Sequence, residues 1–227
     1  MPEPTQTGGT ERAEVARAPG TRASRINDLV GFRVAALQKQ FLAGSQSAQA
    51  DLAKLRRAVG RRAGSVAEVW ELTLEGVSPE RYDSSPSAEE IAVHTAMGLY
   101  ALHQRGNSAP MHVAGTGLGR AVARLSSPAI DSAELATNGV ARRFGALATA
   151  VEMSEIEYHL RGLVTLLSGE SVGLDYGRLA ADLYRVQNPH AVDQVRLNWA
   201  RDFYIRPEKP KTTTPTIENT ETVKDAS

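Results

Sequence analysis

The chain has 227 residues, enough for one core or two small helical ones, and it has no cysteine, which excludes disulfides, thiolate zinc sites and thiol nucleophiles. Lys+Arg and Asp+Glu both number 26, so the overall charge does not indicate a polyanionic partner. The sequence shows neither a membrane-spanning apolar run nor a signal peptide, and we expect a cytoplasmic protein that is neither exported nor anchored to a membrane.

Two tails that we expect to be disordered flank the predicted helices. Residues 1–25 and 206–227 are rich in Thr, Gly, Pro and charged residues and show no apolar periodicity. Between them, from 26 to 205, apolar residues recur at intervals of three and four, which is the helical period. In the first half of this region the pattern predicts helices over 29–41, 52–59 and 92–103, with a short turn over 69–72.

Polar residues mark several of the predicted helix starts. Ser47 is expected to cap the helix over 52–59, and Ser87 with Glu90 makes a capping box for the helix over 92–103. A loop over 104–116 follows, because this run holds glycine, asparagine and proline.

The second half of the chain repeats the helical spacing. Its apolar residues predict helices over 118–125, 140–147, 156–167, 179–183 and 192–203. Pro128 is expected to stop the first of these helices. Ser154 and Glu157 make a second capping box, and Asp175 is expected to cap the helix over 179–183, which Pro189 then ends.

Strand-like alternation is absent from the sequence, so we predict an all-α protein. The expected architecture is a single compact bundle of about seven to nine helices. The loop near the middle allows two lobes, over 26–105 and 116–205.

Catalytic and metal-binding motifs are not found. The five histidines are dispersed and form no compact ligand set. Paired carboxylates such as Glu89 and Glu90 lie at helix starts, where they complement the helix dipole. We therefore expect no enzyme activity, no catalytic residue, no metal and no cofactor. A hydrolase built on His94, His103 and His112 is the least favoured alternative.

The segment Gly115-Thr116-Gly117-Leu118-Gly119-Arg120 is the one motif that suggests a nucleotide site. It lacks the spacing of the dinucleotide fingerprint and the G-K-[ST] of a P-loop. Two interpretations stay open. The glycines could leave backbone N–H groups free to hold a phosphate beside Arg120, or they could serve close packing in a turn.

Positive charge is unevenly distributed and is mostly arginine. From 54 to 62 there are five basic residues and no acid, whereas from 63 to 90 there are seven acids and one base. A GC-rich genome would by itself favour Arg over Lys, but it would not explain where the arginines lie. Guanidinium groups bind phosphate and carboxylate in a forked geometry that an ammonium cannot match.

Sorting the arginines by their neighbours leaves a short list of candidate anion-binding residues. Arg178 and Arg185 can pair with Asp182 and Arg196 with Asp193, so we interpret them as surface ion pairs. Most of the remaining arginines have no acid three or four residues away, and Arg161 is ambiguous because Glu157 precedes it by four. The candidate nucleic-acid-binding residues are Arg56, Arg57, Arg61, Arg62, Arg120, Arg124, Arg142, Arg143 and Arg161.

The candidate arginines lie on separate predicted helices, which suits an extended phosphate backbone better than a small anion. Aromatic residues make up only 5% of the chain, and Trp199 and Phe203 lie on a core stripe. Base-stacking platforms are therefore not expected, and we predict sequence-independent backbone binding.

Ordered motifs along the chain resemble the CasB family, the small subunit of the type I-E CRISPR surveillance complex Cascade. They are LAKLRRAVG (52–60), HTAMGLYALHQ (94–104), MHVAGTGLGRAVARL (111–125), VARRFGALATA (140–150), HLRGLVTLL (159–167), LDYGRLAADLYRVQ (174–187) and VRLNWARDFY (195–204). The resemblance covers roughly residues 28–205. Basic positions of the family pattern correspond to Arg57, Arg120, Arg142, Arg143 and Arg161.

The resemblance implies a non-catalytic, all-helical subunit present in two copies along the guide RNA. Its expected role is antiviral defence, in which it stabilises the R-loop and the displaced strand by binding the backbones of guide RNA and target DNA. The expected partners are the guide RNA, the target and displaced DNA strands, a second copy of the chain, and the large and backbone subunits of Cascade. The alternative is a helical protein-interaction adaptor whose arginines bind acidic partners.

Overall fold

The computed structural model describes residues 21–77, 84–125 and 139–204. Over these ranges the regular structure is helical, apart from one parallel bridge between His112 and Leu174. The predicted all-α class is thus confirmed. The elements are α1 (Arg22–Leu42), α2 (Gln46–Ala58), η1 (Ala67–Val69), α3 (Trp70–Thr73), α4 (Ala88–His103), α5 (Leu118–Ala123), α7 (Gly139–Thr149), α8 (Met153–Gly169), α9 (Tyr176–Val186) and α10 (Val192–Tyr204).

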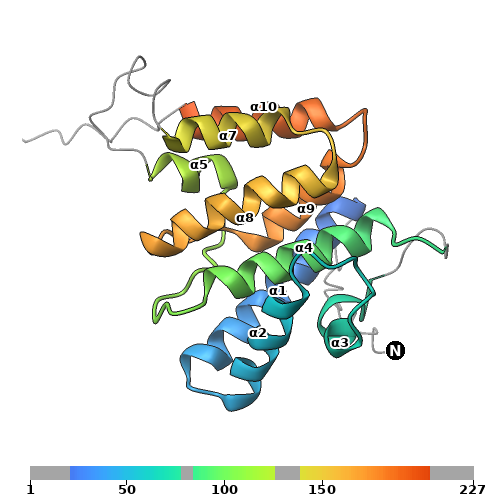
Figure 1. The fold of residues 1–227 in the computed structure, drawn as a ribbon, viewed down its shortest axis with the longest axis vertical. Helices are drawn as coiled ribbons and strands as arrows, with labels where there is room; N and C mark the ends of the chain where they lie inside the picture. Colours follow the sequence, from blue (N-terminus) through green and yellow to red (C-terminus); the bar gives the residue numbers. More distant parts are fainter. Residues whose placement is uncertain (1–20, 78–83, 126–138, 205–227) are drawn as a thin grey trace, which may run out of the picture.

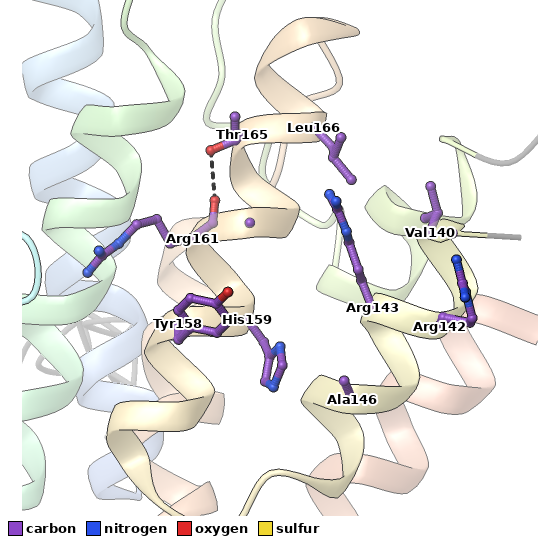
Figure 2. Close-up of a pocket in the computed structure, with 11 residues that line it drawn as sticks. Val140, Arg142, Arg143, Ala146, Tyr158, His159, Arg161, Thr165 and Leu166 are labelled. Atoms are coloured by element: carbon purple, nitrogen blue, oxygen red, sulfur yellow. Dashed lines mark hydrogen bonds between the residues drawn. The ribbon is translucent and has the colours of Figure 1, made fainter.

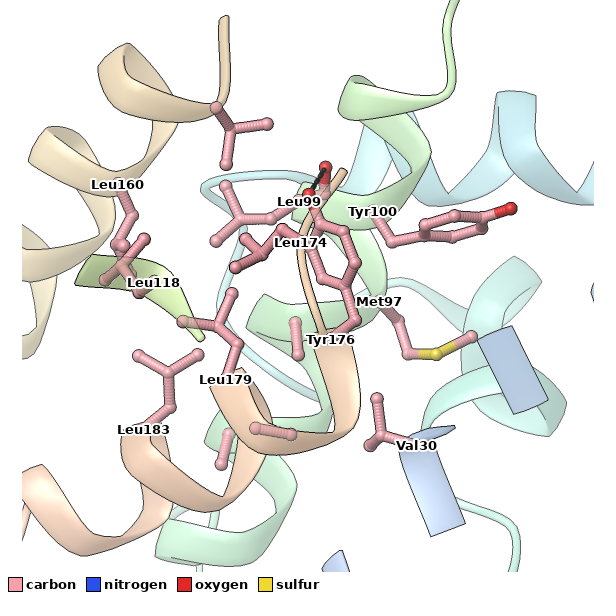
Figure 3. Close-up of a cluster of buried hydrophobic side chains, with 14 of the residues drawn as sticks. Val30, Met97, Leu99, Tyr100, Leu118, Leu160, Leu174, Tyr176, Leu179 and Leu183 are labelled. Carbon is pink, nitrogen blue, oxygen red and sulfur yellow. Dashed lines mark hydrogen bonds between the residues drawn. The ribbon is translucent and has the colours of Figure 1, made fainter. Parts of the chain in front are cut away.

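Helix α4 lies at the centre of the bundle, where it contacts α1, α2, α8 and α9 (Figure 1). Its residues from Ala92 to Ala101 are all buried, because most of them are small or apolar and the two polar ones, His94 and Thr95, contact the carbonyl oxygen of Ala58 and the carboxylate of Glu157. Side chains from α1, α4, α5, α8 and α9 converge on one hydrophobic cluster (Figure 3). Elements of both suggested lobes therefore share a core.

The most extensive helix contact in the described part of the chain joins α1 to α9. Two glycines face each other there, and a Cβ atom at Gly177 would lie 3.1 Å from the Cα of Gly31 and 2.5 Å from the carbonyl oxygen of Asn27. The absence of side chains at this crossing lets the two helices approach closely. None of the described helices is long and apolar enough to cross a membrane.

Two of the four predicted caps are correct. Ser87 and Glu90 form both hydrogen bonds of a capping box at the start of α4. Asp175 caps α9 by accepting a 3.0 Å hydrogen bond from the backbone N–H of Arg178. The prediction of Ser47 was wrong by two residues, because α2 already begins at Gln46 and Ser45 caps it.

The second predicted capping box was wrong. Helix α8 begins at Met153, so Ser154 is already inside it, and Glu152 is the N-cap residue without a capping side chain. The carboxylate of Glu155 instead accepts a hydrogen bond from the N–H of Val151 at 3.2 Å. The carboxylate of Glu157 faces α4, where it accepts a 2.6 Å hydrogen bond from Thr95.

The N-terminal tail was predicted to end too late. Helix α1 begins at Arg22 and Thr21 caps it, so residues 22–25 are helical. Residues 1–20 and 206–227 of the predicted tails, and Pro128, lie outside the described residues.

Candidate nucleic-acid interface

Helices α7 and α8 line a groove of about 900 Å³ whose lining residues include three of the predicted arginines. Arg142 and Arg143 come from α7, and Arg161 comes from α8 (Figure 2). Phe144 and Leu147 bury the opposite side of α7, which leaves its two arginines exposed. The described residues that line the groove include no Asp or Glu. The groove is therefore a concave surface of positive charge.

The arginines of α7 are not neutralised by the described part of the protein, in which no ion pair of Arg142 or Arg143 is found. His159 also lines the groove, with its Nε2 atom 3.7 Å from Glu155 Oε1. Glu157, the acid four residues before Arg161 that could have paired with it, instead accepts a hydrogen bond from Thr95 of α4.

Arg161 extends away from α7, toward α4 and the end of α2 (Figure 2). A Cβ atom at Gly60 would lie 2.6 Å from Arg161 Nη2, so the glycine makes room for the guanidinium group. Gly60 lies within the basic segment 54–62. Arg161 thus reaches from the groove to the residues that follow α2, where Glu157 lines the same small pocket.

The arginines at the end of α2 lie close enough to repel one another. Burial lowers the pKa of the Arg56 guanidinium, and the like charges of Arg105 and Arg57 lower it further. Arg57 forms an ion pair with Glu68 at 2.8 Å, a partner eleven residues away that the search over helical neighbours could not find. Both side chains are more than half exposed, and such pairs contribute at most about 1 kcal/mol.

The remaining predicted arginines are exposed, but the structure does not place them among the residues lining the groove. Arg61 and Arg62 follow α2, and Arg62 donates a 3.2 Å hydrogen bond to the carbonyl oxygen of Ser84. Arg120 and Arg124 belong to α5 and its C-cap, and α5 packs mainly against α10.

Two of the three glycines of the segment 115–120, Gly117 and Gly119, serve close packing, whereas Gly115 has open space around it and a positive φ of 79°. A Cβ atom at Gly119 would collide with a backbone carbonyl oxygen of α10, and one at Gly117 would collide with the carboxylate of Asp202. The N–H of Gly115 donates to Asp175 Oδ2 at 2.7 Å. Carboxylates thus lie beside the start of α5, which favours the packing interpretation over a phosphate site.

The sequence of this helical chain was compared with those of known protein families and of curated proteins. The family described as CRISPR-associated protein Cse2 matches residues 51–204 of the chain. The chain belongs to this family. Together with the solved CasB structures described next, this match confirms the resemblance to CasB noted in the sequence. Curated protein sequences give no match.

Solved structures of the Cse2 (CasB) family share the fold. The chain is 31% identical to CasB from Thermobifida fusca, with a TM-score of 0.66 over 78% of this chain and 97% of that one. It is 25% identical to CasB from Thermus thermophilus, with a TM-score of 0.57 over 82% and 99%. M. ruber CasB, at 23% identity and a TM-score of 0.52 over 76% and 92%, supports the fold alone.

Two of the three predicted ion pairs of this Cse2-family chain were wrong, because neither Arg178 nor Arg185 pairs with Asp182 in the described residues, and the third is confirmed. Arg178 pairs with Asp202 at 2.7 Å and not with Asp182. Asp182 is buried and accepts a 2.8 Å hydrogen bond from the indole N–H of Trp199 in α10. Arg196 and Asp193 pair as expected, although their atoms are 3.8 Å apart.

The histidines of the hydrolase alternative are packing residues. His94 contacts the carbonyl oxygen of Ala58, and His103 Nδ1 lies 2.9 Å from the hydroxyl of Tyr176. His112 Nδ1 accepts the backbone N–H of Tyr176. Burial lowers the pKa of all three, that of His103 to about 4. Among the described residues no group of three or more His, Asp or Glu could hold a metal ion.

Three residues of the interface were missed by the sequence analysis. Tyr158 and His159 line the groove, and Arg105 adds charge next to the end of α2. Tyr158 is three residues before Arg161 and therefore shares its helix face, which is a signal that could have identified it. No local signal exists for Arg105, because its neighbours in space are far away in sequence.

Proposed function

We propose that the chain is the non-catalytic small subunit of a type I-E Cascade and that it binds the backbones of guide RNA and target DNA. In this role it stabilises the R-loop and the displaced strand in antiviral defence. Its partners are those strands, a second copy of the chain, and the large and backbone subunits. Membership of the Cse2 family supports the assembly part of this proposal.

The observation that carries the nucleic-acid part is the α7–α8 groove. Arg142, Arg143 and Arg161 line it, and no Asp or Glu does so among the described residues. A groove with charge of one sign concentrates the field and attracts the opposite charge. Phosphate oxygens match the forked guanidinium geometry, and contacts of this kind carry no sequence information.

The binding surface in this proposal continues from the groove to the end of α2. Arg161 reaches Gly60, just after α2, and Arg56 and Arg57 lie in the last turn of α2 with the charge of Arg105 close by. A surface built from three helices can follow several successive phosphates of one strand. A single small anion would use only one of these clusters.

The proposal is tested by measuring the binding of single-stranded DNA and RNA to the full chain over a series of salt concentrations. Wild type is compared with the double variant Arg142→Ala/Arg143→Ala. Each lost phosphate contact should reduce the log–log salt slope by about 0.7. The matched control is Arg25→Ala/Lys39→Ala, which removes the same charge from exposed positions of α1 and should leave the slope unchanged.

Wild-type binding that does not depend on salt, or an unchanged slope in the α7 double variant, would contradict the proposal. An acidic peptide of the same charge as the oligonucleotide tests the adaptor alternative. If the peptide binds more tightly than either nucleic acid and loses affinity in the same double variant, the groove serves an acidic protein partner instead.

A further inference from the structure

Tyr158 is an exposed aromatic residue within the positive groove. Its exposed fraction is 70%, although it projects from a helix whose other aromatic and apolar residues are mostly buried. The ring contacts that of His159, with centroids 5.4 Å apart and an interplanar angle of 72°. This T-shaped contact leaves most of the tyrosine accessible. An aromatic ring beside unpaired arginines offers both a stacking surface and charge to one ligand.

The groove floor beside Tyr158 is open because of a glycine. Gly162 lies four residues after Tyr158 and therefore shares its helix face. A Cβ atom at Gly162 would meet nothing within 4 Å. Val140, Ala146 and Leu166 add apolar lining. Figure 2 shows Arg143 extending from α7 toward Leu166, so that charge and apolar surface occupy the same groove.

We propose that this groove is a subsite for an unpaired nucleobase, which stacks on Tyr158 while its flanking phosphates bind the arginines of α7 and α8. The inference rests on the proposed function and restricts the ligand of this site to single-stranded nucleic acid. A base paired within a duplex has both faces covered by its neighbours and cannot stack on a side chain. Stacking is tolerant of sequence, since every base has an aromatic face.

The first test compares Tyr158→Ala and Tyr158→Phe by fluorescence anisotropy with a labelled oligothymidine. The alanine variant should bind about fivefold or more weakly, whereas the phenylalanine variant keeps the ring and should bind like wild type. The salt slope should not change in either, because no charge is lost. Phe32→Ala, which removes an aromatic residue of 77% exposure from α1, is the matched control and should have no effect.

A second variant, Gly162→Leu, tests the open floor without removing the ring or any charge. A helical side chain covers the turn N-terminal to its own position, so the introduced leucine would lie over the turn of Tyr158. It should weaken oligothymidine binding by at least as much as Tyr158→Ala does. The position is helical and has space for a Cβ atom, and leucine favours a helix more than glycine does, so the variant should fold, which circular dichroism checks.

The deciding measurement repeats the comparison on an abasic strand of equal length. Wild type and Tyr158→Ala should then bind equally, because the strand keeps its sugar–phosphate backbone but has no base to stack on the ring. If Tyr158→Ala binds oligothymidine as tightly as wild type, or loses as much affinity on the abasic strand, the stacking subsite is refuted. A normal salt slope in that experiment would leave the backbone proposal standing. An acidic peptide whose binding falls in Tyr158→Ala would instead assign the subsite to a protein partner.

Discussion

Replacing Asp182 with asparagine should remove a pH dependence of stability from the contact between α9 and α10. Asp182 is 6% exposed and accepts a 2.8 Å hydrogen bond from Trp199 Nε1. Burial raises the pKa of this carboxyl from 3.8 to about 6, and the Trp199 hydrogen bond and nearby arginines offset burial only in part. Asparagine keeps an acceptor oxygen for the indole N–H but has no charge to bury.

The direction of this pH dependence follows from the pKa of Asp182 in the folded and in the unfolded state. The folded-state pKa of Asp182 lies above the unfolded-state value, so the folded protein binds this proton more tightly. The free energy of unfolding therefore falls as the pH rises from about 4 to about 6, and the contribution of Asp182 is constant above that range. A rise from 3.8 to about 6 corresponds to about 3 kcal/mol. From acidic to neutral pH, the free energy of unfolding of Asp182→Asn should therefore rise by about this much relative to that of wild type.

Urea unfolding followed by circular dichroism, at about pH 4 and about pH 7.5, measures this difference. Comparing the variant with wild type at each pH cancels the titration of all other groups. Asp193→Asn is the control, because its side chain on α10 is 94% exposed and should show no such change. If the free energies of unfolding of Asp182→Asn and wild type differ by the same amount at both pH values, the predicted pH dependence is refuted. It is also refuted if the variant is more stable relative to wild type at the acidic pH than at the neutral one.

Three further predictions concern packing and capping, and each is measured by urea unfolding at neutral pH. Gly119→Ala should lower the free energy of unfolding by about 1–3 kcal/mol, because the added Cβ atom meets the backbone of α10. Its control, Gly145→Ala in α7, has free space for the Cβ atom and should raise the free energy of unfolding by about 0.5–1 kcal/mol. Tyr176→Phe should cost about 1–3 kcal/mol, because it leaves the Nδ1 atom of a buried histidine without a partner. Ser87→Ala should cost about 1 kcal/mol through loss of the capping box, and Ser154→Ala should cost within about 0.5 kcal/mol because this serine is not a cap.

Helix positions could be predicted because the apolar spacing directly reflects which face is buried. The stripe of Leu160, Leu163 and Leu167 was found in this way, and all three residues are buried in α8. Cap residues were harder, because Ser-x-x-Glu occurs at both Ser87 and Ser154. The difference lies in where the preceding chain turns. Helix α8 already begins at Met153, right after the connection from α7 against which it packs, and this tertiary arrangement is not visible in a local motif.

The residues of the site could be predicted only where the charges around them come from nearby positions in the sequence. Arg142 and Arg143 were identified because no acid lies within a helical turn of them, and they line the groove. The pair of Arg57 with Glu68 and the approach of Arg105 to Arg56 depend on how separate segments pack. A sequence search limited to neighbours within one helix cannot find contacts of this kind.

A neutral composition and an anion-binding surface are compatible here because many acids are used inside the fold. Glu89 holds Arg22 at 2.7 Å, Asp202 holds Arg178 at 2.7 Å, and Asp175 caps α9. Each of these carboxylates satisfies a cation or an N–H group of the fold, so it adds little to the field at the α7–α8 groove. At physiological salt, charges more than about 8 Å away are largely screened. Binding in the groove is therefore set by its own arginines, and its salt dependence, not the net charge of the chain, is the quantity that this arrangement predicts.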